Sequence, residues 1–325
     1  MDIIYASNDG YAGFLGISML SLLDNNKDLS RIRVFILAEQ ISPDNQAKLR
    51  QITEQYDREI CFIDIERYRE KMAFDINTSG YNAITLSRLF LCSYLPSDVH
   101  RILYLDCDTI VSGSIAELET ISMEGYPVAA VPELNMPVDK KAIIGHARHE
   151  TYYNAGVLLV NMDLWREEQI EQIFLDYYRS MNGHLLYNDQ DIINHCCKGR
   201  ILTLPYWYNL STNLYYFHRF MVHKLQPAYD VSDATLFKTK VAQPSVIHYM
   251  GDERPWIVGN KNRYRGFYLK YKAMSPFRDL PQIEGQRLYM FCYHTLNLIT
   301  WICPWFRVAF SKFIGINKYE WAGKK

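Results

Sequence analysis

Short apolar segments alternate with helix-like segments through the first two thirds of the chain. The apolar segments are rich in Val, Ile, Leu, Tyr and Phe, as strands buried on both faces are: Ile3–Ala6, Ile32–Ala38, Ile60–Ile65, Ile102–Leu105, Val128–Val131 and Ala155–Asn161. Between them, Ser42 and Pro43 are a good N-cap and first residue of a helix, and apolar residues recur at helical spacing over Asp163–Arg179. This alternation predicts an α/β fold with a mostly parallel central sheet.

Composition narrows the class of protein further. The chain has 325 residues, of which 49% are hydrophobic, with 16 Gly and 12 Pro, so a disordered or collagen-like protein is excluded. Because single cores stop growing near about 250–300 residues, we expect one large domain with an appendage. The net charge of -1 provides no overall basic field, so we expect no nucleic-acid partner.

Seven cysteines lie scattered along the chain, and their odd number does not fit a dense disulfide framework. We therefore expect free thiols and a reducing compartment. The first residues run directly into a strand-like segment, which leaves no room for a secretion signal ahead of the fold. The expected location is the cytoplasm.

The sequence changes character near residue 266, where it becomes rich in tyrosine and basic residues. The last forty residues hold Glu320 as their one acidic residue, against six basic residues: Arg287, Arg307, Lys312, Lys318, Lys324 and Lys325. Residues 288–306 contain no Asp, Glu, Lys or Arg, but polar residues and Pro304 interrupt the apolar run, which disfavours a membrane span.

Tryptophans such as Trp301 and Trp305 beside basic residues favour a segment that lies on an anionic membrane surface. The alternative is that the segment packs on the rest of the chain. We expect a domain of residues 1–265 and a basic, aromatic segment of residues 266–325 that attaches the protein to a membrane.

An acidic triplet, Asp106-Cys107-Asp108, follows the strand Ile102–Leu105. Ligands of parallel sheets bind at the carboxyl ends of the strands, and a bend there turns both carboxylates toward one cation. Carboxylate oxygens suit Mg²⁺ or Mn²⁺ bound together with phosphates. The chain contains a second such triplet, Asp189-Gln190-Asp191, so the strand end is what favours the first as a metal site.

The string from His248 to Trp256 follows another apolar run. A neutral imidazole at His248 completes a metal site, Gly251 allows the backbone to approach a phosphate, and Arg254 offers a fork of donors to phosphate oxygens. Taken singly, His248 is better explained as a histidine that ends a strand.

Six segments in this order resemble the family 8 glycosyltransferases, especially the bacterial lipopolysaccharide and lipooligosaccharide galactosyl- and glucosyltransferases. They are residues 3–9, Leu86-Ser87-Arg88, Asp106-Cys107-Asp108, Asn154-Ala155-Gly156-Val157, Asn188-Asp189-Gln190-Asp191 and the final His-x-x-Gly-x-x-Arg-Pro-Trp string. The resemblance covers about residues 1–265. It implies a GT-A fold, with a Rossmann-like central sheet flanked by helices and a smaller C-terminal helical segment.

The resemblance also implies an activity: transfer of galactose or glucose from a UDP-sugar to a saccharide or glycolipid acceptor, with Mn²⁺ or Mg²⁺ and with retention of the anomeric configuration. Asp106, Asp108 and His248 would hold the metal. The donor would contact Ala6, Asn8, Arg88, Cys107, Asn154, Asp189, Gly251 and Arg254, and the catalytic residues would be Gln190, Asp189 and Arg254.

The chemistry of the leaving group supports these roles. Charge develops on phosphate oxygens as the glycosidic bond breaks, where a divalent metal and Arg254 neutralise it. The amide oxygen of Gln190 stabilises the positive anomeric carbon. We favour a same-face mechanism, in which the leaving phosphate takes the proton of the acceptor, over Gln190 as a covalent nucleophile.

Two departures from the family pattern bear on the donor. Arg254 replaces the more usual Lys, which keeps the charge and widens the donor fork, and Asn8 stands where many members have Asp. Because the Asn side chain can both donate to and accept from the edge of a uracil base, we still expect the site to recognise uridine.

Two alternative functions stay open. One is a noncatalytic sugar-nucleotide-binding protein, and the other is a nucleotidyltransferase or phosphohydrolase with two metals at Asp106 and Asp108. For the transferase we expect a cell-envelope acceptor (a lipopolysaccharide, capsule or glycoprotein glycan) at the inner face of the plasma membrane. The segment Glu133–Tyr153 would cover donor and acceptor, with His146 and His149 as loop or surface histidines.

Overall fold

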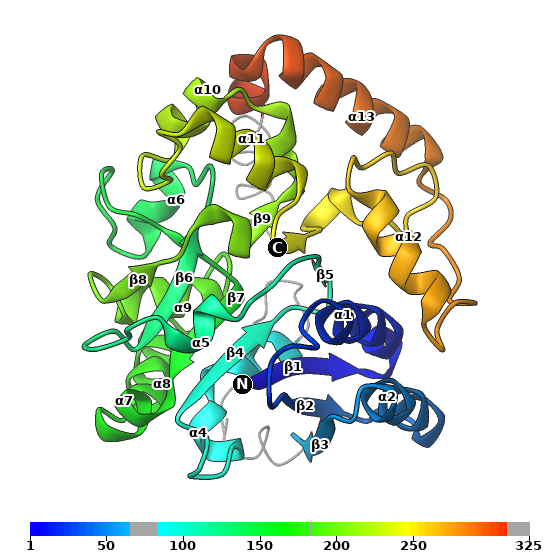
Figure 1. Cartoon of the computed structure of the whole chain (residues 1–325). Helices are drawn as coiled ribbons and strands as arrows, with labels where there is room; N and C mark the ends of the chain where they lie inside the picture. Colours follow the sequence, from blue (N-terminus) through cyan, green and yellow to red (C-terminus); the bar gives the residue numbers. More distant parts are fainter. Residues whose placement is uncertain (66–82, 183, 311–325) are drawn as a thin grey trace.

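A computed structural model describes residues 1–65, 83–182 and 184–310, which form a central sheet flanked by helices (Figure 1). The sheet has seven strands in the order β3-β2-β1-β4-β7-β6-β8. Their bounds are β1 Asp2–Asn8, β2 Arg33–Glu39, β3 Glu59–Asp64, β4 Arg101–Leu105, β6 Val128–Pro132, β7 Tyr153–Asn161 and β8 Ile201–Thr203. The segments predicted as strands are thus confirmed.

The pairing confirms a mostly parallel sheet, with one exception. Strands β3, β2, β1 and β4 are mutually parallel, and so are β6 and β8, but β7 runs antiparallel to both of its neighbours. The amino end of β7 therefore meets the carboxyl ends of β1, β4 and β6 at one edge of the sheet.

Helices cover both faces of this sheet. The α-helices of the described residues are α1 Ala12–Asn25, α2 Pro43–Gln55, α4 Leu91–Tyr94, α5 Glu117–Thr120, α6 Val138–Ile143, α7 Met162–Glu167, α8 Ile170–Ser180, α9 Asp189–Cys196, α10 Arg219–Leu225, α11 Ala234–Ala242, α12 Arg265–Met274 and α13 Arg287–Ile302. Helices α1 and α2 pack on one face, and α7, α8 and α9 pack on the other (Figure 1).

Strand β1 shows why the apolar segments are continuous. Ile3 and Tyr5 belong to the core cluster on one face, and Ile4 and Ala6 belong to the cluster on the other. Since successive side chains of a strand point to opposite faces, a strand covered on both sides must be apolar at every position.

The single helix predicted over Asp163–Arg179 is wrong. Helix α7 ends at Glu167 and α8 begins at Ile170, because Gln169 takes a left-handed conformation with φ 54°. Trp165 of α7 and Phe174 of α8 pack on each other in the same core cluster. One apolar stripe thus runs over two helices, and its spacing gives no sign of the break.

A second, three-stranded sheet brings distant segments together. It contains β5 Thr109–Val111, β9 Leu210–Ser211 and β10 Val246–His248, with β10 antiparallel to β5 and parallel to β9. The register pairs His248 with Thr109, the residue that follows Asp108. This pairing places the histidine beside the acidic triplet.

The chain after residue 265 forms helices α12 and α13, drawn in orange to red in Figure 1. Tyr268, Tyr271, Phe277 and Met290 from this part are buried in the larger core cluster. Within the described ranges, no helix is long and apolar enough to cross a bilayer. Lys312, Lys318, Lys324 and Lys325 lie outside the described residues, and the domain boundary at residue 265 stays a prediction.

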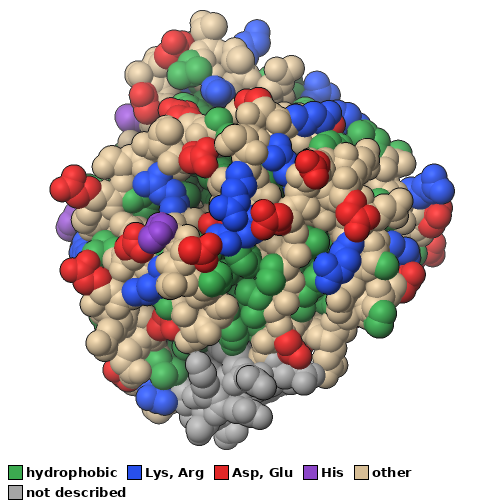
Figure 2. Space-filling view, turned by 60° about the horizontal axis from the view of Figure 1, so that its bottom comes forward, with side chains coloured by type: hydrophobic (Ala, Val, Ile, Leu, Met, Phe, Trp, Pro, Cys, Tyr) green, Lys and Arg blue, Asp and Glu red, His purple; other side chains and the backbone are tan. Residues whose placement is uncertain are grey.

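Acidic and basic side chains are interspersed on the face of the molecule shown in Figure 2, and hydrophobic side chains gather near its middle. Interspersed charges of opposite sign largely cancel at a distance. The long-range field of this face is therefore weak, as the net charge of -1 suggests.

Candidate functional site

A pocket of about 680 Å³ opens at the sheet edge where the ends of β1, β4, β6 and β7 meet. All the residues predicted for metal, donor and catalysis line it: Ala6, Asn8, Arg88, Asp106, Cys107, Asp108, Asn154, Asp189, Gln190, His248, Gly251 and Arg254. The fold thus brings together side chains that are up to 248 positions apart in the chain.

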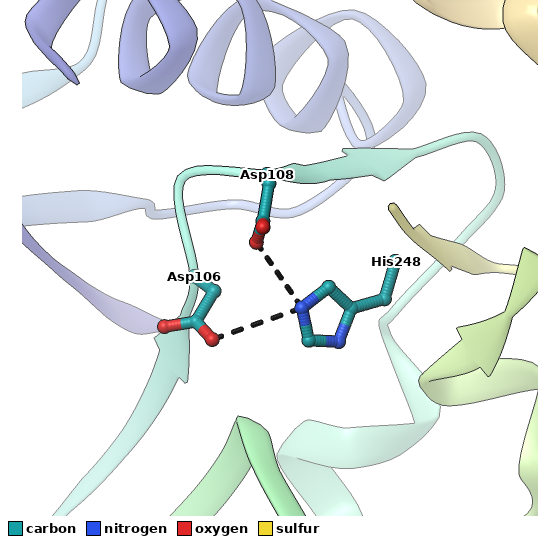
Figure 3. Close-up of side chains that lie close together, drawn as sticks. All are labelled: Asp106, Asp108 and His248. Atoms are coloured by element: carbon teal, nitrogen blue, oxygen red, sulfur yellow. Dashed lines mark hydrogen bonds and ion pairs between the residues drawn. The ribbon is translucent and has the colours of Figure 1, made fainter. Parts of the chain in front are cut away.

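Two carboxylates and one imidazole converge inside this pocket (Figure 3). Nε2 of His248 lies 3.1 Å from Oδ1 of Asp108 and 3.7 Å from Oδ2 of Asp106. One possible ligand atom from each residue lies within 4.8 Å of the others. Hard carboxylate oxygens with one imidazole nitrogen suit Mn²⁺ or Mg²⁺, so this donor set can hold a divalent cation.

Gly156, at the start of β7, makes room for this group. A Cβ atom at position 156 would lie 2.1 Å from Cε1 of His248 and 2.9 Å from Oδ2 of Asp106. Both distances are shorter than van der Waals contact, so only glycine fits here. The backbone of Gly156 also accepts a hydrogen bond of 2.8 Å from the N–H of Asp106, which fixes the end of β4.

Asn209 orients the imidazole of His248. Its Oδ1 lies 2.9 Å from Nδ1 of His248, and its Nδ2 donates to Oδ1 of Asn154 at 2.8 Å. An imidazole that donates through Nδ1 presents Nε2 to a metal, and a hydrogen bond of this kind commonly orients histidines that bind metals. Although burial opposes the charged form, the Asp108 carboxylate raises the pKa of His248 above its ordinary value.

Asn209 has no local signal in the sequence that marks it as a site residue. It stands in an aromatic-rich stretch, and only the pairing of β9 with β10 brings it to His248. Trp207 and Tyr208, just before it, pack into the core cluster.

Arg88 is a buried cation that holds three parts of the site. Its guanidinium donates to the carbonyl oxygen of Ala155 at 2.7 Å and to Oδ1 of Asp106 at 2.8 Å, and its Nε lies 3.2 Å from Oδ2 of Asp189. Because Asp189 is buried, desolvation raises the pKa of its carboxyl to about 6, in spite of the nearby Arg88 charge. Arg88 therefore positions one possible metal ligand, Asp106, and one acidic residue, Asp189, together.

Gln190 and Asn154 are held by their neighbours. The Oε1 of Gln190 accepts from the N–H of Ala155 at 2.9 Å, and Asn154 donates from Nδ2 to Oε2 of Glu133 at 2.9 Å. Glu133 follows β6 and lines the pocket, and burial raises the pKa of its carboxyl. The carboxyl group of Glu133 thus lies at the site.

Arg254 places a positive charge beside the Asp108 carboxylate. Its Nε and Nη2 each lie 3.3 Å from Oδ2 of Asp108, and its guanidinium faces the pocket beside the backbone of Gly251. Gly251 has φ +57°, a conformation that favours glycine. An anion in the pocket therefore meets both a cation and an open stretch of backbone.

Both histidines of the 133–153 segment lie outside helices and strands, as expected. His146 is nevertheless buried, with its Nε2 3.1 Å from the carbonyl oxygen of Asn194, because this part of the segment packs on α9. His149 is exposed, as expected. All seven cysteines are free thiols, which confirms the absence of disulfides predicted for them.

Comparison with known proteins decides the family. The model of glycosyl transferase family 8 matches residues 2–258. The chain belongs to this family. The match contains every residue named above for the pocket.

Several glycosyltransferases are similar in sequence to this family 8 chain. A putative glycosyltransferase of Haemophilus influenzae is 28% identical over 264 residues, covering 79% of this chain and 73% of that one. The lipopolysaccharide 1,2-glucosyltransferase of Escherichia coli is 25% identical over 261 residues, covering 79% and 72%.

A solved structure agrees with the sequence comparisons. The galactosyltransferase LgtC, in complex with donor and acceptor sugar analogs, superposes with a TM-score of 0.71 at 26% identity, covering 85% of this chain and 96% of LgtC. The predicted GT-A fold is thereby confirmed. The chain is a family 8 glycosyltransferase, and membership implies a sugar-nucleotide donor and a saccharide acceptor.

Proposed function

We propose that this enzyme transfers galactose or glucose from a UDP-sugar to a cell-envelope saccharide or glycolipid, with Mn²⁺ or Mg²⁺ and with retention of the anomeric configuration. The observation that carries the proposal is the convergence of Asp106, Asp108 and His248 with Arg254 in one pocket. A lipopolysaccharide glucosyltransferase among the relatives supports the class of acceptor.

The residues of the site fit a divalent cation. Asp106, Asp108 and His248 would hold it, in the space that Gly156 leaves open. When bound, the cation supplies Lewis-acid neutralisation of the leaving diphosphate. Arg254 neutralises the same phosphate oxygens through its guanidinium, and the backbone at Gly251 lies against them.

The ends of β1 and β4 would bind the nucleotide. Ala6 and Asn8 meet the uracil, and the Oδ1 of Asn8 is oriented by the N–H of Tyr11 at 3.2 Å. Cys107 donates its thiol hydrogen to the carbonyl oxygen of Ala6 at 3.3 Å, so it joins the two strand ends. This contact explains a buried thiol at the site without a reactive role, and burial raises the pKa of Cys107 accordingly.

The remaining polar residues would bind the sugar. Arg88, Asn154 and Asp189 fix its hydroxyl groups, and the amide oxygen of Gln190 faces the anomeric carbon. As the bond to the diphosphate breaks, that oxygen stabilises the developing positive charge. The leaving phosphate accepts the proton of the acceptor hydroxyl on the same face, so the configuration is retained.

A nucleotide-release assay tests this proposal. The enzyme is offered UDP-galactose, UDP-glucose, UDP-N-acetylglucosamine and GDP-mannose, each with and without Mn²⁺, and Asp106→Asn is the control. We expect Mn²⁺-dependent release from one UDP-sugar, reduced at least about 100-fold in the variant. Silence with every donor, together with no metal-dependent binding of UDP, would contradict the proposal and favour the noncatalytic alternative.

We further propose that α13 attaches the enzyme to the inner face of the plasma membrane, so that the protein is cytoplasmic and peripheral. Large apolar side chains are exposed on and just after this helix: Leu288, Tyr289, Phe291, Leu298, Trp301, Ile302, Trp305 and Phe306. Interfacial aromatics with nearby basic residues such as Arg307 suit an anionic lipid surface.

Vesicle sedimentation at low salt tests the attachment. We expect binding to vesicles that contain phosphatidylglycerol, weaker binding to pure phosphatidylcholine, and weaker binding by Phe291→Ser, which replaces a side chain that is 67% exposed. Failure of the wild-type protein to bind anionic vesicles would contradict the proposal.

A further inference from the structure

Residues 250–262, named the donor loop from here on, carry Gly251 and Arg254 into the pocket and are hydrogen-bonded to α13. The backbone of this loop is tied to the C-terminal part of the chain. The N–H of Val258 donates to the carbonyl oxygen of Ile283, and the N–H of Ile283 donates to that of Trp256, both at 2.9 Å. The N–H of Lys261 donates to Nε2 of His294 on α13 at 2.7 Å.

Two side chains of α13 hold the turn of the loop itself. The hydroxyl of Tyr289 donates to Oδ2 of Asp252 at 2.8 Å, and Nδ2 of Asn297 donates to Oε1 of Glu253 at 3.0 Å. Asp252 and Glu253 are the two residues that stand between Gly251 and Arg254. Helix α13 therefore contacts the loop at the point where it reaches into the pocket.

The contact between Asn297 and Glu253 is buried and fully paired. Each residue is 1% exposed. The other carboxylate oxygen of Glu253 accepts from Nδ2 of Asn262 at 2.6 Å, and Oδ1 of Asn297 accepts from Nη1 of Arg307. A buried carboxylate is costly unless its hydrogen bonds are made, so this network favours one arrangement of the loop.

We propose that α13 is a positioning element of the donor site, in which Asn297 and Glu253 hold Gly251 and Arg254 where the diphosphate of the donor binds. This inference rests on the function proposed for the pocket. It gives the C-terminal helix a role in donor binding that is separate from any contact with a membrane. Neither residue touches the substrate, so both act through the donor loop.

Asn297→Asp tests the proposal by placing a second carboxylate opposite that of Glu253. Two buried carboxylates cannot both be ionised at this distance without cost, so the loop should move away. We expect the KM for the donor to rise about tenfold, with kcat changed less than about threefold. The double variant Glu253→Gln/Asn297→Asp reverses the hydrogen bond and should restore KM to within about threefold of wild type.

A matched control is Asn213→Asp. Asn213 also contacts α13, through a hydrogen bond of 3.2 Å from the hydroxyl of Tyr293 to its Oδ1, but it makes none to the donor loop. It should leave the donor KM unchanged. A folded Asn297→Asp variant with the wild-type KM would overturn the proposal, and so would a loss that the double variant does not repair.

A second variant covers the case in which Asn297→Asp does not fold. Tyr289→Phe removes only the bond to Asp252 from a half-exposed side chain, and we expect it to raise the donor KM about two- to fivefold. An unchanged KM in this variant would count against the proposal.

Amide hydrogen exchange separates this inference from the proposed function, because it needs no donor. Exchange in peptides covering residues 250–262 should be faster in Tyr289→Phe and Asn297→Asp than in wild type and Asn213→Asp. If the wild-type protein releases nucleotide from none of the donors, the proposed function is contradicted. Hydrogen exchange still tests whether α13 positions the donor loop. Unchanged exchange in the loop would overturn that positioning.

Discussion

Gly156 lies against His248 so closely that a Cβ atom on the glycine would stand 2.1 Å from Cε1 of the imidazole. The same Cβ atom would stand 2.9 Å from Oδ2 of Asp106. Two of the three side chains that could hold a metal thus depend on the absence of a side chain at position 156. The positions of His248 and Asp106 therefore depend on a residue near the start of β7.

Gly156→Ala should therefore disable the metal site while the fold survives. The added methyl displaces His248 and Asp106, and misplacement of reacting groups by about 1 Å costs about 100-fold in rate. The measurement is Mn²⁺-dependent nucleotide release. Gly266→Ala, where the methyl meets open space on α12, is the matched control and should keep full activity. Wild-type activity in Gly156→Ala would contradict the geometry of the site.

Arg88→Lys should lower both stability and activity, although it keeps the charge. An ammonium cannot reach Ala155, Asp106 and Asp189 together as the guanidinium does, so buried acceptors lose their partner. We expect the free energy of unfolding in urea to fall by about 1–3 kcal/mol and the activity to fall at least about tenfold. A substitution without effect on either quantity would show that the charge alone matters.

Activity should fall below pH 6 because of Asp189. Burial raises the pKa of this carboxyl to about 6, so the ionised form, which is proposed to accept hydrogen bonds from sugar hydroxyls, exists mainly above that pH. At saturating Mn²⁺, kcat/KM for the donor should fall about tenfold per pH unit below 6. Asp189→Asn should have lower activity without this decline. An equal decline in wild type and variant would assign it to another group.

Stability should fall on acidification through His294. This imidazole accepts the N–H of Lys261 through Nε2, and burial and the Lys261 charge lower its pKa below the ordinary value. The unfolded state therefore binds a proton more readily than the folded state, so this contribution is present above about pH 6.5 and is lost as the pH falls through the unfolded value. Thermal unfolding from pH 8 to 5 should show a smaller loss in His294→Gln than in wild type; equal losses would exclude this role.

The large sheet could be predicted from sequence because its strands are buried on both faces. A segment such as Ile102–Leu105 is apolar at every position, and the polar residues Asp106 and Asp108 mark where it ends. Site residues of this kind are visible locally, since they stand where apolar runs stop. The family resemblance rests on six segments in their order along the chain, and several of them stand where apolar runs stop.

Other features depend on pairings between distant segments. The antiparallel direction of β7 is invisible in its own sequence, because a strand buried on both faces is apolar in either direction. Asn209 reaches His248 only through the pairing of β9 with β10. The burial of His146 likewise follows from the packing of its segment on α9, which no periodicity in residues 133–153 reveals.

Calorimetric titration of UDP into the protein, with and without Mn²⁺, tests whether Asp106, Asp108 and His248 form a cation site for the donor's diphosphate. We predict one UDP bound per chain in the presence of Mn²⁺, and binding at least about tenfold weaker without it or in Asp108→Ala. Equal affinity for UDP with and without Mn²⁺ in the wild-type protein would show that these residues hold no cation for the diphosphate.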